Sequence, residues 1–215
     1  MITVYSHPFL YHLAMRLLYG RQFTGRYEVI SSQIPDRSQV VEVCCGDCYL
    51  YTHYLKRKQV DYLGLDINPL FLDYARKKGV SVRRFDLWKD PIPSAEIIVM
   101  QGSLSQFIPH HRQILERLLA AARGRLIVAE PVRNLAASKN PIIAYLAKRL
   151  SDPGFYETGN PYLGKRFDTD SLTALFTSFE EFRSFIGTPG KELVGVFVAK
   201  PQSETRRPAE TPEGS

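Results

Sequence analysis

Residues 38–58, SQVVEVCCGDCYLYTHYLKRK, decide the fold of this chain. The apolar run over 38–45 predicts a buried β-strand, and the stretch 49–58 predicts a helix. A short turn with one glycine, Gly46, joins them. In an open α/β sheet, ligands bind beyond the carboxyl ends of the strands, where the strand order reverses. This first strand–turn–helix is therefore where we expect a ligand site.

Strand and helix patterns alternate through the rest of the chain, which is typical of βαβ crossovers and a sheet covered on both faces. The last two strand patterns are separated by Gly-Thr-Pro-Gly and a lysine, which indicates a hairpin-like return. We expect a doubly wound, seven-stranded, mostly parallel sheet with an antiparallel C-terminal strand, in three α/β/α layers. The further expected strands are 60–66, 80–86, 95–101, 125–131, 180–187 and 192–200, and the further expected helices are 69–79, 112–124 and 168–176.

The remaining segments frame this domain. Leucines near helical spacing predict a helix over 8–20, and a second short helix is expected over 21–32. The last residues are polar and proline-rich, so they cannot bury enough surface to become ordered. The predicted organisation is an N-terminal helical lid (1–37), a Rossmann-like domain (38–200) with an insertion at 131–167, and a disordered tail (201–215).

Composition limits the class of protein. The chain has 215 residues, 44% of them hydrophobic, and a formal net charge of +6. These are ordinary globular values, which exclude a disordered or collagen-like chain. The charge permits nucleic acid, acidic metabolites or an anionic membrane surface as partners. Basic runs such as 56–58 and 76–78 are better interpreted as solvated helix ends, where cations suit the helix dipole.

The three cysteines, Cys44, Cys45 and Cys48, lie at the end of the first expected strand and in the turn that follows it. An odd number within five residues cannot form a disulfide framework, so we expect reduced thiols and a cytoplasmic protein. A zinc site formed with His53 is one alternative, although the spacing lacks paired C-x₂-C knuckles. Small buried hydrophobes are the favoured interpretation of these cysteines.

An acidic residue ends the second expected strand. Asp66 follows Gly46 by twenty residues, the spacing at which a carboxylate meets ribose hydroxyls. A dinucleotide would need more glycines in the first turn, because bare backbone must approach its pyrophosphate. S-adenosylmethionine (SAM) carries no phosphate, so it fits a turn with a single glycine better. The alternative role of Asp66 is to cap the helix at 69–79.

In these motifs the chain resembles the class I SAM-dependent methyltransferases. The family's first motif, acidic-x-Gly-x-Gly-x-Gly, corresponds to Glu42-Val-Cys-Cys-Gly-Asp-Cys48, in which only the middle glycine is kept. The second motif corresponds to YLGLDINP, the third to RRFDL and the strand-four region to IIVMQGSLSQF. The resemblance covers roughly residues 38–200 and implies SAM as the cofactor. The cofactor-binding residues that it implies are Glu42, Cys44, Gly46, Asp66, Ile67, Asn68, Asp86, Leu87 and Gln101.

The resemblance also implies a role for each region. The turn from Cys44 to Gly46 passes its backbone against the methionine part of SAM, and Asp66 accepts from the ribose. Ile67 or Asn68 flanks the adenine. Two further residues, Asp86 and Leu87, would lie at the adenine, and Gln101 would lie at the methyl group and methionine part of SAM. Asp86 accepts from the adenine amino group with Leu87 beside it, and Gln101 lies near the methyl group.

Methyl transfer needs mainly proximity and alignment, so no catalytic dyad need be visible. If the acceptor requires a base, His110 or His111 is the candidate, and a solvated histidine pair is the alternative. The segment QGSL, at 101–104, lacks the motif of base-amino methylases, which argues against amino methylation of nucleic-acid bases. We expect a small-molecule acceptor, and the basic, apolar stretch 141–150 allows an apolar or lipid-like one, or contact with a membrane surface.

Two other functions stay open at this stage. An RNA or protein acceptor is the alternative within the enzyme class. A catalytically inactive binding or scaffold protein is the alternative outside it, because the first motif has lost two glycines. No apolar run reaches the ~18 residues of a membrane-spanning helix, so no transmembrane segment is expected.

Overall fold

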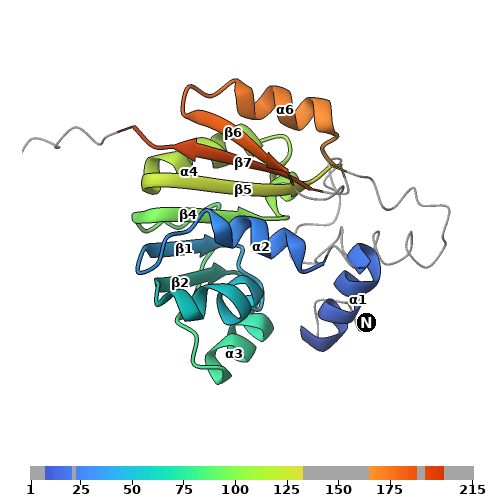
Figure 1. Cartoon of the computed structure of the whole chain (residues 1–215), viewed down its shortest axis with the longest axis vertical. Helices are drawn as coiled ribbons and strands as arrows, with labels where there is room; N and C mark the ends of the chain where they lie inside the picture. The colour runs from blue at the N-terminus through green and yellow to red at the C-terminus, as the bar shows by residue number, and fades with distance from the viewer. Residues whose placement is uncertain (1–7, 21–22, 133–164, 188–191, 201–215) are drawn as a thin grey trace, which may run out of the picture.

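A computed structural model describes residues 8–20, 23–132, 165–187 and 192–200. Its centre is a seven-stranded sheet in the order β3-β2-β1-β4-β5-β7-β6 (Figure 1). β7 runs antiparallel to both of its neighbours, and the other paired strands are parallel. The strands are β1 (Gln39–Val43), β2 (Asp61–Asp66), β3 (Val82–Arg84), β4 (Ala95–Gln101), β5 (Ala122–Pro131), β6 (Phe182–Gly187) and β7 (Glu192–Val198).

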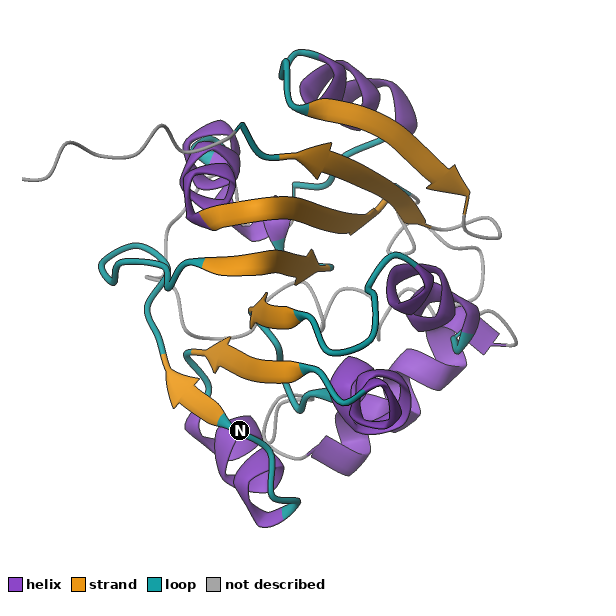
Figure 2. Cartoon of the chain, turned by 60° about the vertical axis from the view of Figure 1, so that its left-hand side comes forward, coloured by secondary structure: helices purple, strands orange, loops and turns teal. Residues whose placement is uncertain are grey.

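Helices cover both faces of this sheet (Figure 2). On one face α4 and α6 pack in a core that includes Leu118 and Phe176. On the other face α1, α2 and α3 pack in a core that includes Ile30 and Leu72. The helices are α1 (Pro8–Tyr19), α2 (Gly25–Ser32), α3 (Pro69–Lys77), α4 (His111–Ala121) and α6 (Thr169–Thr177), with short turns η3 (Tyr51–Leu55), η4 (Lys56–Lys58) and η5 (Leu104–Phe107).

The predicted fold class is confirmed, including the three layers and the antiparallel C-terminal strand. β4 has the predicted bounds, because a central parallel strand is apolar on both faces and stands out in the sequence. The predicted hairpin is also present, and β7 lies between β5 and β6 while β6 forms the edge. In the described residues, no helix is both long and apolar enough to cross a membrane.

Two element predictions were wrong in detail. The helix expected at 112–124 ends at Ala121, and β5 starts at the next residue, so Gly124 lies inside the strand. A Cβ on Gly124 would lie 3.0 Å from the Glu96 carbonyl oxygen, so the close approach of β5 to β4 favours glycine there. The helix expected at 49–58 continues as a π-helical turn and then a 3₁₀ turn.

Helix α1 lies at the carboxyl ends of the central strands, where His12 pairs with Asp47 in the turn after β1. Figure 1 shows α1 beside one end of the sheet, next to α2. Ile30 of α2 is fully buried in the same core as Val40 and Ile97 of the sheet. α2 therefore packs directly onto the sheet. The 141–150 helix, most of the 131–167 insertion and the 201–215 tail lie outside the described residues.

Candidate cofactor site

The turn after β1 keeps the backbone of a glycine-rich loop with only one of its three glycines. Cys44, Gly46 and Cys48 have φ angles of 57°, 55° and 59°, in the left-handed region. These are the three positions that carry glycine in the motif this turn resembles. L-residues pay roughly 1–2 kcal/mol for that conformation. The two cysteines thus adopt the backbone shape that the missing glycines would have given.

Two of the thiols lie beneath this turn, against the neighbouring strand. A Cβ placed on Gly64 of β2 would lie 2.9 Å from the sulfur of Cys45 and 3.0 Å from that of Cys48. Burial raises the pKa of the Cys45 thiol well above its usual value. These two sulfurs therefore fill the space above Gly64 in the sheet, which is the packing role expected of small buried hydrophobes.

Cys44 and His53 differ from this thiol pair in burial and in their neighbours. The Cys44 side chain is half-buried, and burial raises the pKa of its thiol. His53 stacks on Tyr49 at a ring separation of 3.8 Å, and its Nδ1 lies 2.9 Å from the Thr52 hydroxyl. Within the described residues, no group of three His, Cys, Asp or Glu side chains is arranged to hold a metal ion.

Asp66 lies at the end of β2 and faces the turn. Its Oδ2 accepts a hydrogen bond of 2.8 Å from the Gly46 backbone N–H, and its Oδ1 accepts one of 2.8 Å from the Asn68 N–H. Burial raises the pKa of the Asp66 carboxyl, and these backbone donors oppose the rise. Each carboxylate oxygen has two lone pairs, so it can still accept from a ligand hydroxyl. This arrangement fits a ribose.

The two residues after Asp66 have different surroundings. Asn68 is buried, and its Oδ1 caps α3 by accepting from the Leu70 N–H at 3.0 Å. Ile67 is half-buried. The capping role that the sequence left open for Asp66 thus belongs to Asn68, and Ile67 is the more exposed of the two adenine candidates.

The third-motif residues form a turn after β3. The Asp86 carboxylate accepts from the Trp88 N–H at 3.0 Å and lies 3.4 Å from the Lys89 ammonium. Leu87 is buried in the core of the α4 face, and its carbonyl accepts from Arg117. Asp86 remains half-buried at the strand edge, whereas the Leu87 side chain points into the core.

Glu42 lies inside the domain, on β1. It is buried, and its Oε2 accepts a hydrogen bond of 2.6 Å from the Tyr62 hydroxyl on β2. Burial raises the pKa of Glu42 to about 8. The side chain thus links two neighbouring strands below the turn.

His110 and His111 lie at the start of α4. The His110 ring meets Trp88 edge-on at 5.7 Å, and the His111 ring meets Phe167 edge-on at 5.2 Å. Burial lowers the pKa of His111, and its Nδ1 is buried with no hydrogen-bond partner in the described residues. Both histidine rings therefore pack against aromatic side chains.

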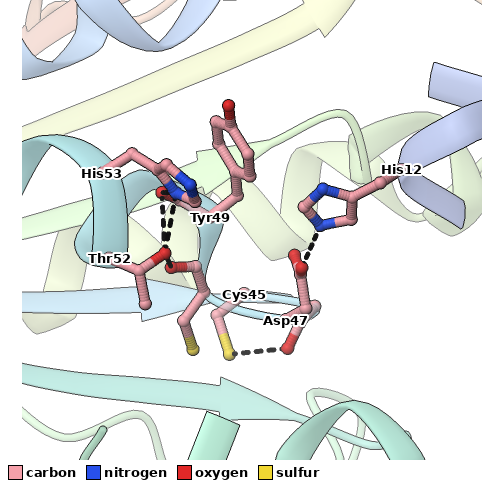
Figure 3. A network of polar contacts seen from close by, with 8 residues as sticks. His12, Cys45, Asp47, Tyr49, Thr52 and His53 are labelled. Atoms are coloured by element: carbon pink, nitrogen blue, oxygen red, sulfur yellow. Dashed lines mark hydrogen bonds and ion pairs between the residues drawn. The ribbon is translucent and has the colours of Figure 1, made fainter. Parts of the chain in front are cut away.

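A contact that sequence reasoning left unassigned joins α1 to the turn. The Nε2 of His12 pairs with the buried Asp47 carboxylate (Figure 3). The His12 ring also lies 5.0 Å from the Tyr49 ring. His12 was visible in the sequence only as one of several histidines, and Asp47 only as a residue between Gly46 and Cys48.

A second missed cluster lies at the ends of β4 and β7. Arg26 of α2 pairs with Glu192, the first residue of β7, and both side chains are buried. Gln101 Nε2 lies 3.4 Å from Glu192 Oε2, so the predicted methyl-proximal residue belongs to this cluster. The only sequence signal was a charged residue at the start of an apolar strand and an arginine beside aromatic residues.

Known structures share the fold of this chain. A SAM-dependent methyltransferase from Thermotoga maritima superposes with a TM-score of 0.63 at 15% identity, over 92% of this chain and 98% of that one. Magnesium protoporphyrin IX methyltransferase from Synechocystis, solved with S-adenosylhomocysteine (SAH), gives 0.58 at 14% identity, over 87% and 86%. At these identities the likeness concerns the fold. Both have the fold described above.

Sequence comparison gives a relative and a family in addition to the fold. A curated relative, trans-aconitate 2-methyltransferase from Rhodococcus jostii, is 28% identical over 134 residues, which are 60% of this chain. The match spans about half of that relative, 51% of its length. The fold is that of the class I SAM-dependent methyltransferases, a class whose cofactor is SAM. Within that class the chain belongs to the family of the methionine biosynthesis protein MetW, whose model matches residues 25–136.

Proposed function

We propose that this protein is an enzyme that transfers a methyl group from SAM to a small-molecule acceptor. The observation that carries the proposal is the Gly46–Asp66 hydrogen bond. It holds a half-buried carboxylate against a turn whose backbone retains a glycine-like shape. A ribose needs such an acceptor, and a cofactor without phosphate tolerates the two cysteines.

The residues of the chain would mainly bind and align. Asp66 would accept from the ribose hydroxyls, and the half-buried side chains of Ile67 and Asp86 would border the adenine. When bound, SAM supplies a methyl group on a positively charged sulfur that is a good leaving group. The protein's contribution is then proximity and orientation. Glu42 and Asn68 would support the site from below, through Tyr62 and through the cap of α3.

The acceptor class is supported by what related proteins act on. The curated relative is named for trans-aconitate, and one fold neighbour is named for magnesium protoporphyrin IX. Both are small molecules. An apolar or lipid-like acceptor is the finer proposal, and it rests on the sequence of the 141–150 stretch. Reduced, buried thiols support the proposal of a cytoplasmic location.

A base is needed only when the acceptor must lose a proton. His111 is the better of the two candidates, because its lowered pKa keeps the ring neutral near pH 7 and its Nδ1 is unpartnered in the described residues. His110 lies against the exposed Trp88. The role of either histidine depends on the acceptor.

Calorimetric titration with SAM and SAH tests the cofactor part of the proposal. We expect Asp66→Ala to lose about 1–3 kcal/mol of SAH binding, because the ribose hydroxyls lose a charged acceptor. Asp73→Ala, an exposed aspartate on α3, is the matched control and should bind as the wild type does. If the wild type binds neither ligand, the protein is a scaffold with a methyltransferase fold.

Methyl incorporation tests the acceptor. The protein is incubated with labelled SAM and separate metabolite, RNA and protein fractions. Label in small molecules is the expected result. Label confined to RNA or protein would exclude the small-molecule proposal while leaving the cofactor assignment intact.

A further inference from the structure

Arg26 is a buried arginine whose hydrogen-bonding groups are only partly used. Arg26 is 4% exposed, and one of its nitrogens, Nη2, pairs with Glu192. The other two nitrogens, Nε and Nη1, are buried and have no hydrogen-bond partner in the described residues. An unsatisfied buried donor is costly, and it costs most on a charged group. A guanidinium left in this state is prepared for a ligand that accepts hydrogen bonds.

Neighbouring side chains hold the guanidinium in one orientation. The Tyr19 ring lies 4.3 Å from the Arg26 Cζ, and the Tyr27 ring lies 5.3 Å from it. Burial lowers the pKa of Arg26, but Glu192 and the neighbouring tyrosines together raise it above its ordinary value, so the side chain is charged. A rigid, charged and desolvated donor binds an anionic oxygen more strongly than a solvated one does.

This ion pair lies at the same sheet edge as the cofactor residues. Arg26 Nη2 is 3.5 Å from the position of a Cβ on Gly102, which follows β4 directly. Helix α1 borders both regions, because its His12 pairs with Asp47 beside Gly46 and its Tyr19 ring lies 4.3 Å from the Arg26 Cζ. A ligand whose ribose meets Asp66 would therefore have its other end near this pair.

We propose that Arg26 and Glu192 bind the zwitterionic α-amino-acid group of a ligand, namely that of the methionine part of SAM. The carboxylate accepts from the free N–H groups of Arg26. The ammonium donates to Glu192 in place of the Gln101 amide, whose 3.4 Å contact is long for a hydrogen bond. This inference rests on the proposed function, because it assumes that SAM lies along this edge.

Charge balance favours a zwitterion over a simple anion. Arg26 and Glu192 already neutralise each other, so a lone carboxylate would add a net negative charge to a buried site. The buried carboxyl of Glu130 and the half-buried one of Asp66 lie along the same edge, at the ends of β5 and β2. A zwitterion adds no net charge, and each of its ends meets the opposite charge.

The test compares two ligands that differ in this group. SAH carries the amino acid, whereas 5′-methylthioadenosine has the same adenosine and sulfur with only a methyl in its place. Calorimetry gives both dissociation constants for the wild type and for Arg26→Lys, which keeps the charge and loses the planar fork. Arg125→Lys, at an arginine bonded to the Gln33 carbonyl, is the matched control.

We expect the wild type and Arg125→Lys to bind SAH more tightly than 5′-methylthioadenosine. Arg26→Lys should weaken SAH binding about tenfold to a hundredfold, the range of a lost charged hydrogen bond, and leave 5′-methylthioadenosine binding unchanged. Binding of the smaller ligand also reports that the site is folded. If Arg26→Lys does not fold, Arg26→Met combined with Glu192→Gln removes both charges and should show the same selective loss.

Other outcomes distinguish a failure of this inference from a failure of the proposed function. An unchanged ratio of the two dissociation constants in the Arg26 variants would overturn the inference and leave the proposed function standing. Binding of neither ligand to the wild type would overturn the proposed function itself. An amino-acid acceptor would present the same group. An Arg26-dependent thermal shift of the SAH-saturated protein with a free L-amino acid would reassign the site to that acceptor.

Discussion

His12 of α1 pairs with the buried carboxylate of Asp47 in the turn after β1. Asp47 stands between Gly46, which donates to Asp66, and Cys48, whose sulfur packs on Gly64. One side chain of the N-terminal helix is thus attached to the turn that faces the cofactor edge. The position of α1 and the shape of the turn are therefore coupled.

His12→Ala should weaken both the fold and SAH binding. It removes the partner of a buried carboxylate, so we expect a loss of about 1–3 kcal/mol in the free energy of unfolding and a weaker SAH affinity. Urea denaturation and calorimetry measure the two effects. Leu17→Ala, at an exposed position of the same helix, is the control. Equal SAH affinity for His12→Ala and Leu17→Ala would show that α1 is not coupled to the site.

Cys44 provides a test of the left-handed turn. Cys44→Gly should be tolerated or should stabilise the protein by up to about 1 kcal/mol, because glycine adopts positive φ without steric cost. Cys44→Val should destabilise it by more than the glycine variant gains, since a β-branched residue is a poor fit at φ 57°. Thermal unfolding ranks the two. A valine variant as stable as the glycine variant would contradict the turn geometry.

The sequence predicted those parts of the fold that local patterns determine. Apolar runs marked the strands, and β4 was located to the residue because both of its faces are buried. The end of α4 could not be located in this way, because the alanines before Gly124 have high helix propensity. Pairing of Ala122 with Ala95 overrides that propensity and starts the strand early.

The site residues also fall into two groups, those that a local pattern identifies and those that only the fold brings together. Asp66 could be found because a strand end and a spacing identify it. The Arg26–Glu192 pair could not, because the partners come from the second helix and the last strand and neither lies in a motif. Only the fold brings them together. Asn68 shows the converse, since a motif position implied ligand contact and the structure gives it a capping hydrogen bond.

Gly64→Ala should destabilise the protein by about 1–3 kcal/mol, because the new methyl would meet the sulfurs of Cys45 and Cys48 at 2.9 and 3.0 Å. Cys45→Ala removes one of those sulfurs, so the double variant should recover part of the loss. A double-mutant cycle in urea measures this coupling. Gly25→Ala, where a Cβ meets nothing within 4 Å, is the control. Purely additive losses would mean that the thiols do not pack on Gly64.

The final prediction concerns pH and the buried Glu42. Burial raises its pKa from an ordinary 4.5 to about 8, so between these values the folded protein holds a proton that the unfolded chain has lost. The free energy of unfolding must then fall as pH rises through this window, by at most about 1.4 kcal/mol per pH unit from this one group. The Tyr62 hydrogen bond to Glu42 opposes the rise in pKa and moderates the effect.

Glu42→Gln is the matching variant, because it keeps the shape and a hydrogen-bonding oxygen but has no proton to lose. We expect its stability to change less than that of the wild type between pH 5 and pH 8, so that it gains on the wild type as pH rises. Urea denaturation at each pH unit measures the difference. Parallel curves would show that Glu42 has the same protonation in the folded and unfolded states, and its burial beside Tyr62 would then need another charge partner.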